Sequence, residues 1–373
     1  METLLPILEQ PTQNNHPTYK VGVRRKTRQV NIGGIKVGGG APISVQTMTK
    51  TKTDDVAGTV KQIRDAAEAG CDIVRVTVND KEAAEAMAEI VRQSPIPIVA
   101  DIHFNHIFAL KAIAAGVAKV RINPGNIGSK ERIHEVLTAA KDKGIPIRIG
   151  VNSGSLEEDI LEKHGYPTAE ALFESAMRHV EICDEFNFKD VIISVKSTDV
   201  RLMIEAYRLV GARTDIPLHL GVTEAGLTRV GTIKSAVGIG TLLAEGIGDT
   251  IRVSLTDEPI KEVEVGKEIL RSLGLASRNV ELIACPTCGR LEIDLFAIMA
   301  ELEKRLEGVK KPVKVAVLGC VVNGPGEASD ADIGIAAGKG VGILYRKGEM
   351  VKRVKESEIV DTIVEEVHKF QPE

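Results

Sequence analysis

Three cysteines and one carboxylate in the last quarter of the 373-residue chain have the types and spacing of metal ligands. Cys285 and Cys288 form a Cys-x-x-Cys pair, Cys320 follows at a distance, and Glu327 comes shortly after it. A Cys-x-x-Cys pair with one further cysteine can hold a metal ion or an iron–sulfur cluster. The fourth coordination position is then left for a weaker oxygen ligand, and a cluster of that kind can meet a substrate directly.

The spacing alone does not choose between zinc and iron. A structural zinc site prefers four Cys or His ligands, and near Cys320 the sequence offers no second Cys or His. We expect the Gly-Pro-Gly segment 324–326 to turn the chain so that the carboxylate of Glu327 reaches the metal. The remaining two of the five cysteines, Cys71 and Cys183, are expected to be inert small apolar residues.

Basic residues interrupt five apolar runs that otherwise read as buried strands. They are Arg75, Arg121, Arg148, Lys196 and Arg252. A buried charge needs compensation, because desolvating an ion is expensive. Most of the five lie towards the C-terminal ends of their runs, where barrel enzymes place their chemistry, so we expect them to converge on one positively charged mouth.

Such a mouth is suited to phosphate, because arginine recognises phosphate or carboxylate with paired hydrogen bonds. Ser254 and the loop 123–128, which begins with Asn123, add donors of the kind that cradle phosphate. Alternatively, the cations pair with acidic neighbours in a structural network: Asp72, Asp101, Asp190 and Asp249. Five cations leave a surplus of positive charge, so we predict a phosphate-bearing or polyanionic ligand.

The acid–base candidates are the polar residues at the ends of the same runs. They are Asp101, His103, Asn152, His219 and Glu224. A lone histidine near a strand is more often a satisfied core residue than a catalytic one. For His103 and His219, both roles stay open. Glu224 follows a predicted strand directly and is expected at the mouth, as an electrostatic partner or a proton donor.

Eight short apolar runs, separated by amphipathic helical patterns, organise the chain between residue 43 and about residue 275. The runs are 43–48, 72–78, 96–102, 119–124, 145–151, 190–196, 218–223 and 249–255. Continuous apolar runs are typical of parallel strands buried on both faces, and eight β/α units predict a closed (β/α)8 TIM barrel over residues 25–278. A doubly wound open sheet is the alternative, but no Gly-x-Gly-x-x-Gly follows the first strand.

Three further segments complete the predicted organisation. Residues 30–37 read as a hairpin with a two-glycine turn that closes the bottom of the barrel. A short extra helix is expected over 156–164, on the active face. Residues 279–373 predict a small α+β domain whose cysteines follow strands, and residues 1–24 are expected to form a flexible tail.

Composition excludes several classes of protein. A net charge of −4, a pI near 6.1 and an aromatic content of 3% argue against nucleic-acid binding. The dense basic run 24–28 is interpreted as a solvated edge. No apolar run reaches the ~20 residues of a membrane helix, and residues 1–20 lack the features of a signal peptide. An odd number of cysteines in a chain of this length indicates a reducing compartment, so we expect a cytoplasmic protein.

In combination, these segments resemble the 4-hydroxy-3-methylbut-2-enyl diphosphate synthase family, iron–sulfur enzymes of the non-mevalonate isoprenoid pathway. The matching segments are the two cysteine motifs and residues 44–49, 101–105, 120–126 and 148–154. The resemblance runs from about residue 25 to the C-terminus, and the chain length suits the two-domain bacterial form.

The resemblance implies a [4Fe–4S] cluster held by Cys285, Cys288, Cys320 and Glu327. It implies reductive ring opening and dehydration of 2-C-methyl-D-erythritol 2,4-cyclodiphosphate to the linear allylic diphosphate. By the same analogy, the diphosphate is gripped by Arg75, Arg121, Arg148, Lys196, Arg252 and Ser254. The erythritol part is addressed by Asn123, Asn152 and Glu224.

The resemblance also implies partners: reduced flavodoxin or ferredoxin as electron donor, and a homodimer in which one chain's cluster domain caps the other chain's barrel. Three other functions remain as alternatives, of which a nucleic-acid-binding zinc module needs a basic face that the composition argues against. An electron carrier needs the cluster but not the five barrel cations. A barrel aldolase or phosphosugar enzyme with a structural zinc needs the cations but no redox chemistry.

Overall fold

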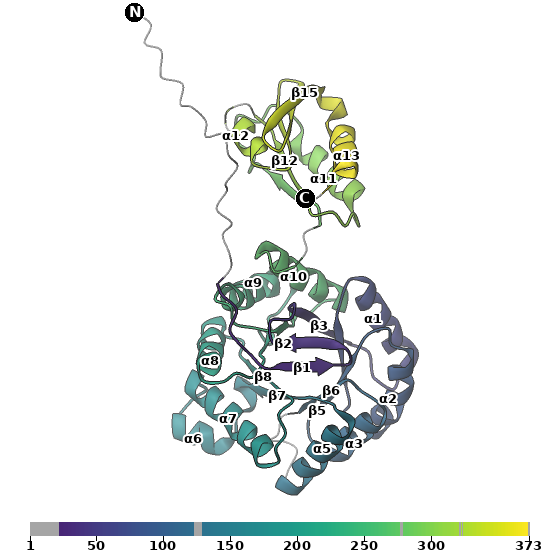
Figure 1. Cartoon of the computed structure of the whole chain (residues 1–373), viewed down its shortest axis with the longest axis vertical. Helices are drawn as coiled ribbons and strands as arrows, with labels where there is room; N and C mark the ends of the chain where they lie inside the picture. Colours follow the sequence, from purple (N-terminus) through teal and green to yellow (C-terminus); the bar gives the residue numbers. More distant parts are fainter. Residues whose placement is uncertain (1–21, 123–128, 277–278, 321, 323, 372–373) are drawn as a thin grey trace, which may run out of the picture. The chain divides into compact units, whose positions relative to one another are not determined.

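The computed structural model describes residues 22–122, 129–276, 279–320, 322 and 324–371. The chain divides into two compact units, Met1–Leu275 and Ala276–Glu373. In the first unit, helices surround a ring of strands (Figure 1). The second unit is a small sheet with helices.

Eight parallel strands form the barrel of the first unit. They are β3 (Ser44–Met48), β4 (Ile73–Thr77), β5 (Ile98–Ile102), β6 (Lys119–Ile122), β7 (Ile147–Asn152), β8 (Val191–Lys196), β9 (His219–Leu220) and β10 (Thr250–Ile251). Their order in the sheet is β8-β7-β6-β5-β4-β3-β10-β9. A parallel bridge between Ile193 and Leu218 joins the two ends, with the Ile193 amide donating to the Pro217 carbonyl at 3.0 Å. The predicted TIM barrel is confirmed.

The helices of this unit begin at the end of the barrel where the strands finish. They are α1 (Val56–Glu68), α2 (Lys81–Gln93), α3 (His106–Ala114), α5 (Lys130–Lys143), α6 (Glu158–His164), α7 (Ala169–Glu185), α8 (Val200–Arg213), α9 (Thr228–Ala244) and α10 (Pro259–Ser272), with the 3-10 turn η1 (Ser153–Ser155) before α6. Side-chain caps fix several of the starts: Asp80 accepts from the Ala83 amide at 2.7 Å, for example. Among the described residues, none of the helices combines the length and apolarity needed to cross a bilayer.

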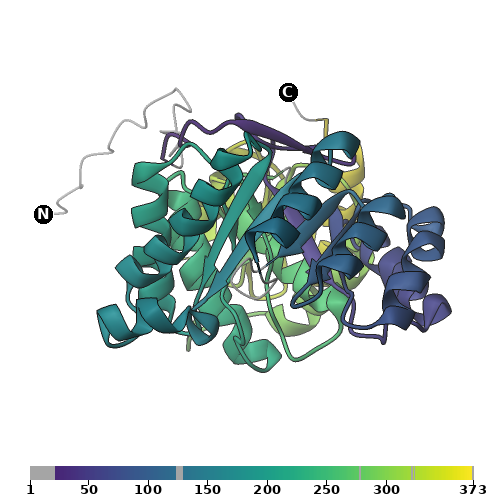
Figure 2. The same cartoon turned by 90° about the horizontal axis from the view of Figure 1, so that it is seen from below.

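A hairpin covers the end of the barrel where the strands begin (Figure 2). It consists of β1 (Gln29–Ile32) and β2 (Ile35–Gly38), joined by two glycines with positive φ. The buried side chains of Val30, Ile32 and Val37 pack against the early residues of barrel strands, Ile73 among them. The predicted hairpin and its place are therefore confirmed.

The basic run 24–28 is not a solvated edge, and that interpretation is wrong. Arg24 Nη2 lies 3.2 Å from the buried carboxylate of Asp249, and the guanidinium of Arg25 donates to the carbonyl of Gly211 at 3.3 Å. Burial lowers the pKa of Arg25, an effect that Asp249 partly offsets. These contacts begin with the Gly22 amide, which donates to the Ala244 carbonyl. The run therefore fastens the chain to the barrel just before the hairpin.

The second unit is built on one five-stranded sheet. Its elements are β11 (Glu281–Ala284), α11 (Leu295–Leu306), β12 (Lys314–Leu318), α12 (Gly324–Ser329), β13 (Ile333–Gly338), β14 (Val341–Arg346), β15 (Glu349–Lys355), the 3-10 turn η2 (Glu356–Glu358) and α13 (Ile359–Lys369). The strands lie in sequence order, with β11, β12 and β13 parallel and the last two antiparallel.

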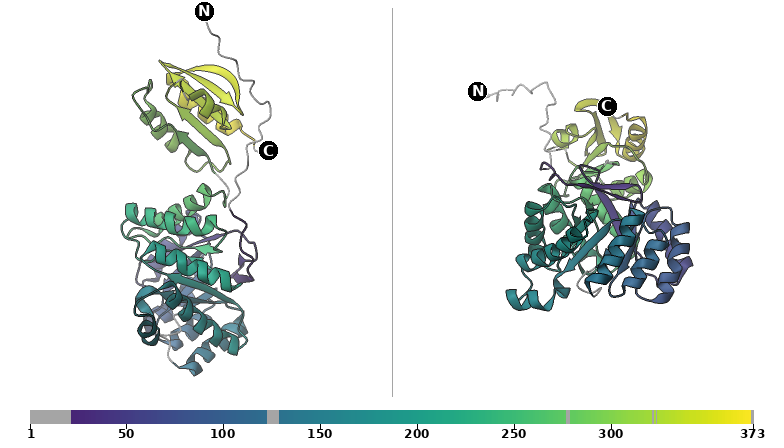
Figure 3. Two further views of the ribbon diagram at one scale, coloured as in Figure 1. Left: turned by 90° about the vertical axis from the view of Figure 1, so that its left-hand side faces the viewer. Right: turned by 60° about the horizontal axis from the view of Figure 1, so that its bottom comes forward.

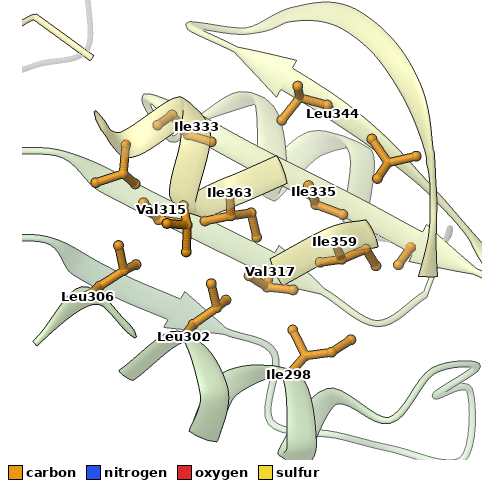
Figure 4. Packing of buried hydrophobic residues seen from close by; sticks show 14 of the residues in the cluster. Ile298, Leu302, Leu306, Val315, Val317, Ile333, Ile335, Leu344, Ile359 and Ile363 are labelled. Atoms are coloured by element: carbon orange, nitrogen blue, oxygen red, sulfur yellow. The ribbon is translucent and has the colours of Figure 1, made fainter. Parts of the chain in front are cut away.

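Two layers of apolar side chains hold the second unit together. On one face of the sheet, α11 and α13 bury a core that includes Leu302, Val317, Ile335 and Ile363 (Figure 4). Figure 3 shows α13 lying along the strands. On the other face, Ala328 of α12 packs in a smaller cluster of mostly alanine side chains. The sheet therefore fixes the positions of the loops that follow β11 and β12.

Two details of this unit differ from the sequence expectations. The segment 324–326 is helical and forms the first turn of α12, where proline is tolerated because its missing N–H has no helical partner there. Strand β15 was not expected, because all but one of its residues are exposed and several are charged. Such exposed charge is typical of an edge strand.

The hairpin contact can be tested with Ile32→Ala. Because Ile32 is fully buried in the cluster beneath the barrel, the substitution is expected to lower the free energy of unfolding by about 2–5 kcal/mol. Ile32→Val, which removes one methylene, should cost about 0.5–1.5 kcal/mol. Urea denaturation of the three proteins measures both effects, and equal stability of wild type and Ile32→Ala would show that the hairpin does not support the barrel.

Candidate functional site

The predicted cations of the barrel share one buried region at its mouth. Neighbouring strands place them in register: Arg121 of β6 lies beside Arg148 of β7, and Asn152 of β7 lies beside Lys196 of β8. Arg75, Arg121, Arg148 and Lys196 are at most 9% exposed, and the Arg252 side chain is 13% exposed. The strand register explains the convergence, because residues in register on neighbouring strands point to the same face of the sheet.

Asp101 is the carboxylate at the centre of this group. Its Oδ1 accepts from Arg121 Nη1 at 3.1 Å, and its Oδ2 lies 3.6 Å from Arg75 Nε. Burial alone would raise the pKa of Asp101, but Arg75 and Arg121 more than offset burial and hold that pKa well below its usual range. Asp101 is therefore an ionised structural counterion and not a candidate general acid.

A second carboxylate, Glu262 of α10, reaches the mouth from the helical layer. Its Oε1 lies 3.2 Å from Arg252 Nη2 and accepts from the Leu255 amide at 3.0 Å. Its Oε2 accepts from the Thr47 hydroxyl at 2.7 Å. Glu262 is 1% exposed, so it balances Arg252 without reaching solvent. Sequence reasoning did not find it, because a glutamate in an amphipathic helix looks like a surface residue.

Of the other predicted acidic partners, Asp190 is exposed, and two pair with cations outside the mouth. Asp249 pairs with Arg24, and Asp72 pairs with Lys267 at 3.1 Å. No ion pair to Arg148 or Lys196 occurs among the residues that the structure describes, and Arg148 Nε and Nη1 have no hydrogen-bond partner there. The mouth therefore keeps the surplus of positive charge that the sequence indicated.

This surplus lowers the pKa values of the cations themselves. Burial lowers the pKa of Lys196 well below its usual value, and Arg148 and Arg252 add to the effect by repulsion. Burial likewise lowers the pKa of Arg75 to about 10, with Asp101 opposing the shift. An anionic ligand at the mouth would relieve both costs, desolvation and repulsion, at once.

Two glycines make room for the charged ends of these side chains. A Cβ atom on Gly150 of β7 would lie 2.5 Å from Arg121 Nε, and one on Gly221 would lie 2.8 Å from Lys196 Nζ. Real Cβ contacts are not that short, so a larger residue at Gly150 would displace Arg121. One at Gly221 would press on both Lys196 and the Arg252 carbonyl, 2.6 Å away. No feature of the sequence alone points to this role of the two glycines.

Glu224 lies in the loop that follows β9, and its side chain is exposed. Its φ of 49° is in the left-handed region, which glutamate rarely adopts. The Thr223 amide donates to the Ser197 carbonyl, and the Thr256 amide donates to the Gly226 carbonyl, so neighbouring loops hold both sides of this residue. Backbone held in a rare conformation is typical of functional sites.

The remaining predicted site residues of the barrel also lie at its mouth, with one exception. Asn152 ends β7 and Ser254 follows β10, and both are half-buried. Asn123 falls outside the described residues.

The two histidines take different positions. His103 is partly exposed beside Asp101, and its Nε2 is 3.1 Å from Arg121 Nη1. Burial lowers the pKa of His103, with Asp101 opposing the shift. His219 is fully buried inside the barrel, and burial, followed by repulsion from Arg148, lowers its pKa well below the usual value. His219 is therefore a neutral core residue, while His103 belongs to the mouth.

In the second unit, the cysteine motifs follow two adjacent parallel strands. Ala284 of β11 is in register with Val317 of β12. Cys285 comes directly after β11, with Cys288 in the same loop, and Cys320 comes shortly after β12. Parallel strands finish at one edge of a sheet, so all three thiols belong to the same edge. Cys288 is exposed, and Cys285 and Cys320 are half-buried.

Glu327 lies in α12, the element that follows Cys320, and its side chain is exposed. Helix α12 contacts β12 and β13, so it starts at the same edge of the sheet. Within the described residues, no three Cys, His, Asp or Glu side chains converge on a single metal position. A cubane cluster binds each ligand at a different iron, so three thiolates and a carboxylate spread along one edge fit it.

The other two cysteines are buried in the barrel unit. Burial raises the pKa of both Cys71 and Cys183 to about 12. The Cys71 thiol donates to the Ile73 carbonyl at the start of β4. Both are inert thiols of the barrel unit, as predicted.

Fold and site define a TIM-barrel protein with a positively charged mouth and a separate α+β domain that carries three cysteines at one sheet edge. The family model described as the GcpE TIM-barrel domain matches residues 27–267, and that of the GcpE protein C-terminal domain matches residues 281–369.

Curated relatives carry the name 4-hydroxy-3-methylbut-2-en-1-yl diphosphate synthase (flavodoxin). That of Clostridium perfringens is 59% identical over 341 residues, which cover 91% of this chain and 98% of the relative. That of Geobacillus thermodenitrificans is 55% identical over 350 residues, 94% of both chains. The chain belongs to the GcpE family and is an oxidoreductase of isoprenoid biosynthesis, as the resemblance predicted.

One solved structure similar to the barrel is 3-dehydroquinate dehydratase from Geobacillus kaustophilus. The TM-score is 0.49 and the identity 15%, covering 68% of this chain and 100% of that chain.

Asp101→Asn tests the central counterion. The substitution leaves Arg75 and Arg121 buried without their carboxylate, so the free energy of unfolding should fall by about 3–5 kcal/mol. Because the folded pKa of Asp101 is lowered, its contribution is complete at neutral pH and disappears only as the pH falls through that folded pKa. The difference in Tm between wild type and variant should therefore stay constant from mildly acidic to mildly basic pH.

Asp65→Asn is the matched control. Asp65 pairs with Lys61 on the outer surface of α1, where an exposed pair contributes about 1 kcal/mol or less. A Tm loss in Asp101→Asn no larger than that of the control would show that Asp101 is not the counterion of the mouth.

Proposed function

We propose that the chain catalyses the reductive ring opening and dehydration of 2-C-methyl-D-erythritol 2,4-cyclodiphosphate to 4-hydroxy-3-methylbut-2-enyl diphosphate. The observation that supports the site assignment is the surplus of buried positive charge at the barrel mouth. Two carboxylates, Asp101 and Glu262, face five predicted cations, and Arg148 keeps unpartnered donors. A diphosphate is the ligand whose charge and acceptor number match such a surplus.

The diphosphate is held by the buried cations together with the hydroxyl of Ser254. Arg121, Arg148 and Lys196 come from consecutive strands, so their donors approach from one side of the barrel. Arg75 and Arg252 approach from the opposite strands, β4 and β10. Asn123 and Asn152 follow β6 and end β7, where their amides address the hydroxyls of the carbon skeleton.

Ring opening releases a phosphate oxygen from carbon, so negative charge grows on the diphosphate. Cations fixed before the reaction stabilise that charge without reorganising. Asp101 holds Arg121 in place, and Glu262 holds Arg252. Gly150 and Gly221 leave space for the side chains of Arg121 and Lys196. Glu224, held at the mouth in its left-handed conformation, supplies the proton for the departing hydroxyl.

The cofactor is a [4Fe–4S] cluster held by Cys285, Cys288, Cys320 and Glu327. When bound, a cluster with one oxygen ligand supplies electrons one at a time and Lewis-acid help at the iron that a substrate can reach. The exposed position of Glu327 on the short helix α12 allows its carboxylate to leave without unfolding the sheet that holds the three thiols.

The partners follow from the same assignment. The electron donor is reduced flavodoxin, which appears in the names of the curated relatives, and ferredoxin is the alternative. The enzyme works as a homodimer, in which one chain's cluster domain serves the barrel of the other, and in the cytoplasm.

The decisive assay is performed under strict anaerobiosis on protein with full iron and sulfide content. The protein is incubated with the cyclic diphosphate and a low-potential one-electron reductant, and the linear allylic diphosphate is quantified. Its formation would support the assignment. No product from fully loaded protein would separate the cluster from this substrate and favour an electron carrier.

Arg121→Ala should raise the Kd of the cyclic diphosphate by about one to two orders of magnitude. The substitution removes a charged hydrogen bond, worth about 1.5–3 kcal/mol. Equilibrium binding without reductant measures it. Arg92→Ala, which removes an exposed helical arginine, should leave the Kd unchanged. Unaltered affinity in Arg121→Ala would place the anion site elsewhere.

Two variants distinguish the roles of the cluster ligands. Glu327→Ala should keep much of the iron but lose most turnover, because three thiolates still hold the cluster. Cys320→Ser should lose the cluster, because one of its three thiolate ligands is gone. Iron and sulfide analysis with steady-state rates measures both. A full iron complement in Cys320→Ser, or wild-type rates in Glu327→Ala, would contradict the ligand set.

A further inference from the structure

A lysine that sequence reasoning did not single out lies below the predicted diphosphate site. Lys119 is the first residue of β6, two positions before Arg121, so both side chains point to the same face of the strand. Its side chain is 0% exposed. Lys119 Nζ donates to Gln46 Oε1 at 3.3 Å, and no ion pair to a carboxylate occurs among the described residues.

The surroundings of Lys119 contain donors and positive charge. Arg75 of β4 and Arg148 of β7 repel it electrostatically, and His219 faces it from β9. On β5, the residue in register is Val99, and Asp101 above it is engaged by Arg75 and Arg121. Several polar atoms of this layer have no described partner: Gln46 Nε2, Arg148 Nε and Nη1, and both ring nitrogens of His219.

An ammonium group is costly in this layer for two reasons. It is desolvated, and its nearest charged neighbours have the same sign. Gln46 Oε1 supplies one acceptor, whereas an ammonium has three N–H donors. A neutral amine needs fewer acceptors and carries no charge to be compensated. Burial and repulsion by Arg148 lower the pKa of Lys119 well below its usual value, in agreement with the geometry.

We propose that Lys119 is a neutral amine in the ligand-free enzyme and takes up a proton when the cyclic diphosphate binds in the layer above it. Lys119 is a positioning residue in this scheme: it does not touch the substrate, but its new charge faces the bound anion. The proposal rests on the proposed function, because it requires a diphosphate at the mouth.

The ligand changes the balance at Lys119 by adding negative charge to a low-dielectric layer. Once Arg75 and Arg148 face the diphosphate, their repulsion of Lys119 is offset, and the protonated form becomes favourable. Each phosphate of the cyclic compound carries one strongly acidic oxygen and is already ionised at neutral pH. Protons taken up on binding therefore go to the protein and not to the ligand.

Calorimetric titration of the oxidised holoenzyme with the cyclic diphosphate tests the proposal, without reductant so that no turnover occurs. Performed at neutral pH in two buffers with different ionisation enthalpies, the titration gives the number of protons taken up per ligand bound. In wild type, Lys119 should take up a proton from solution, in addition to uptake by other buried groups such as Lys196 and His103.

Lys119→Met, similar in length and unable to ionise, should lose about one proton of this uptake. By linkage, the Kd of wild type should rise with pH more steeply than that of the variant. Lys119→Gln is the second neutral variant, and Lys36→Met, which removes an exposed lysine of β2, is the matched control with unchanged uptake.

The ligand-free enzyme offers an independent measurement. Unfolding returns Lys119 to water, where it is protonated up to pH ~10.4, so wild type becomes more stable as the pH rises towards that value. Lys119→Met should have a Tm at least as high as wild type at neutral pH, and the difference should shrink in alkali.

The outcomes separate the two proposals. Binding with no proton uptake, or with the same uptake in Lys119→Met and Lys119→Gln as in wild type, would overturn the role of Lys119 and leave the proposed function intact. No binding of the cyclic diphosphate by the wild-type holoenzyme would overturn both.

Discussion

The placement of more positive than negative charge inside the barrel is the constraint on which the rest of the structure depends. A buried carboxylate, Asp101, lowers the cost of two arginines, and Glu262 does the same for Arg252 from the helical layer. Neither reaches Arg148 or Lys196, and the geometry around those two leaves the charge to a ligand. Stability and binding are therefore opposed here. Each further acidic residue would stabilise the folded state by pairing with a buried cation, and it would weaken the affinity for an anion.

The two units divide the chemical work in a way their architectures explain. A barrel presents side chains from many strands to one point, which suits a ligand with many acceptors. The second unit instead places Cys285 and Cys320 at the finishing edge of two adjacent parallel strands, and Glu327 on a short helix beside them. In the proposed cluster site, the exposed carboxylate of Glu327 would give way to substrate while the three thiolates stay bound.

The sequence predicted the barrel because eight continuous apolar runs at regular spacing have few alternatives, and it predicted the mouth because charge in such runs is anomalous. It missed residues whose roles depend on neighbours distant in the chain. Glu262 reads as a surface residue until Arg252 is seen beside it, and Gly150 acquires its role from Arg121. Helix α12 was missed because Gly-Pro-Gly favours turns locally, and packing against β12 and β13 overrides that preference.

The hairpin β1–β2 determines from which end of the barrel substrate and product are exchanged. Because Val30, Ile32 and Val37 cover the end where the strands begin, a ligand approaches the buried cations from the end where the strands finish. Reactant, product and displaced water must all use the same passage, so one molecule has to depart before the next is admitted.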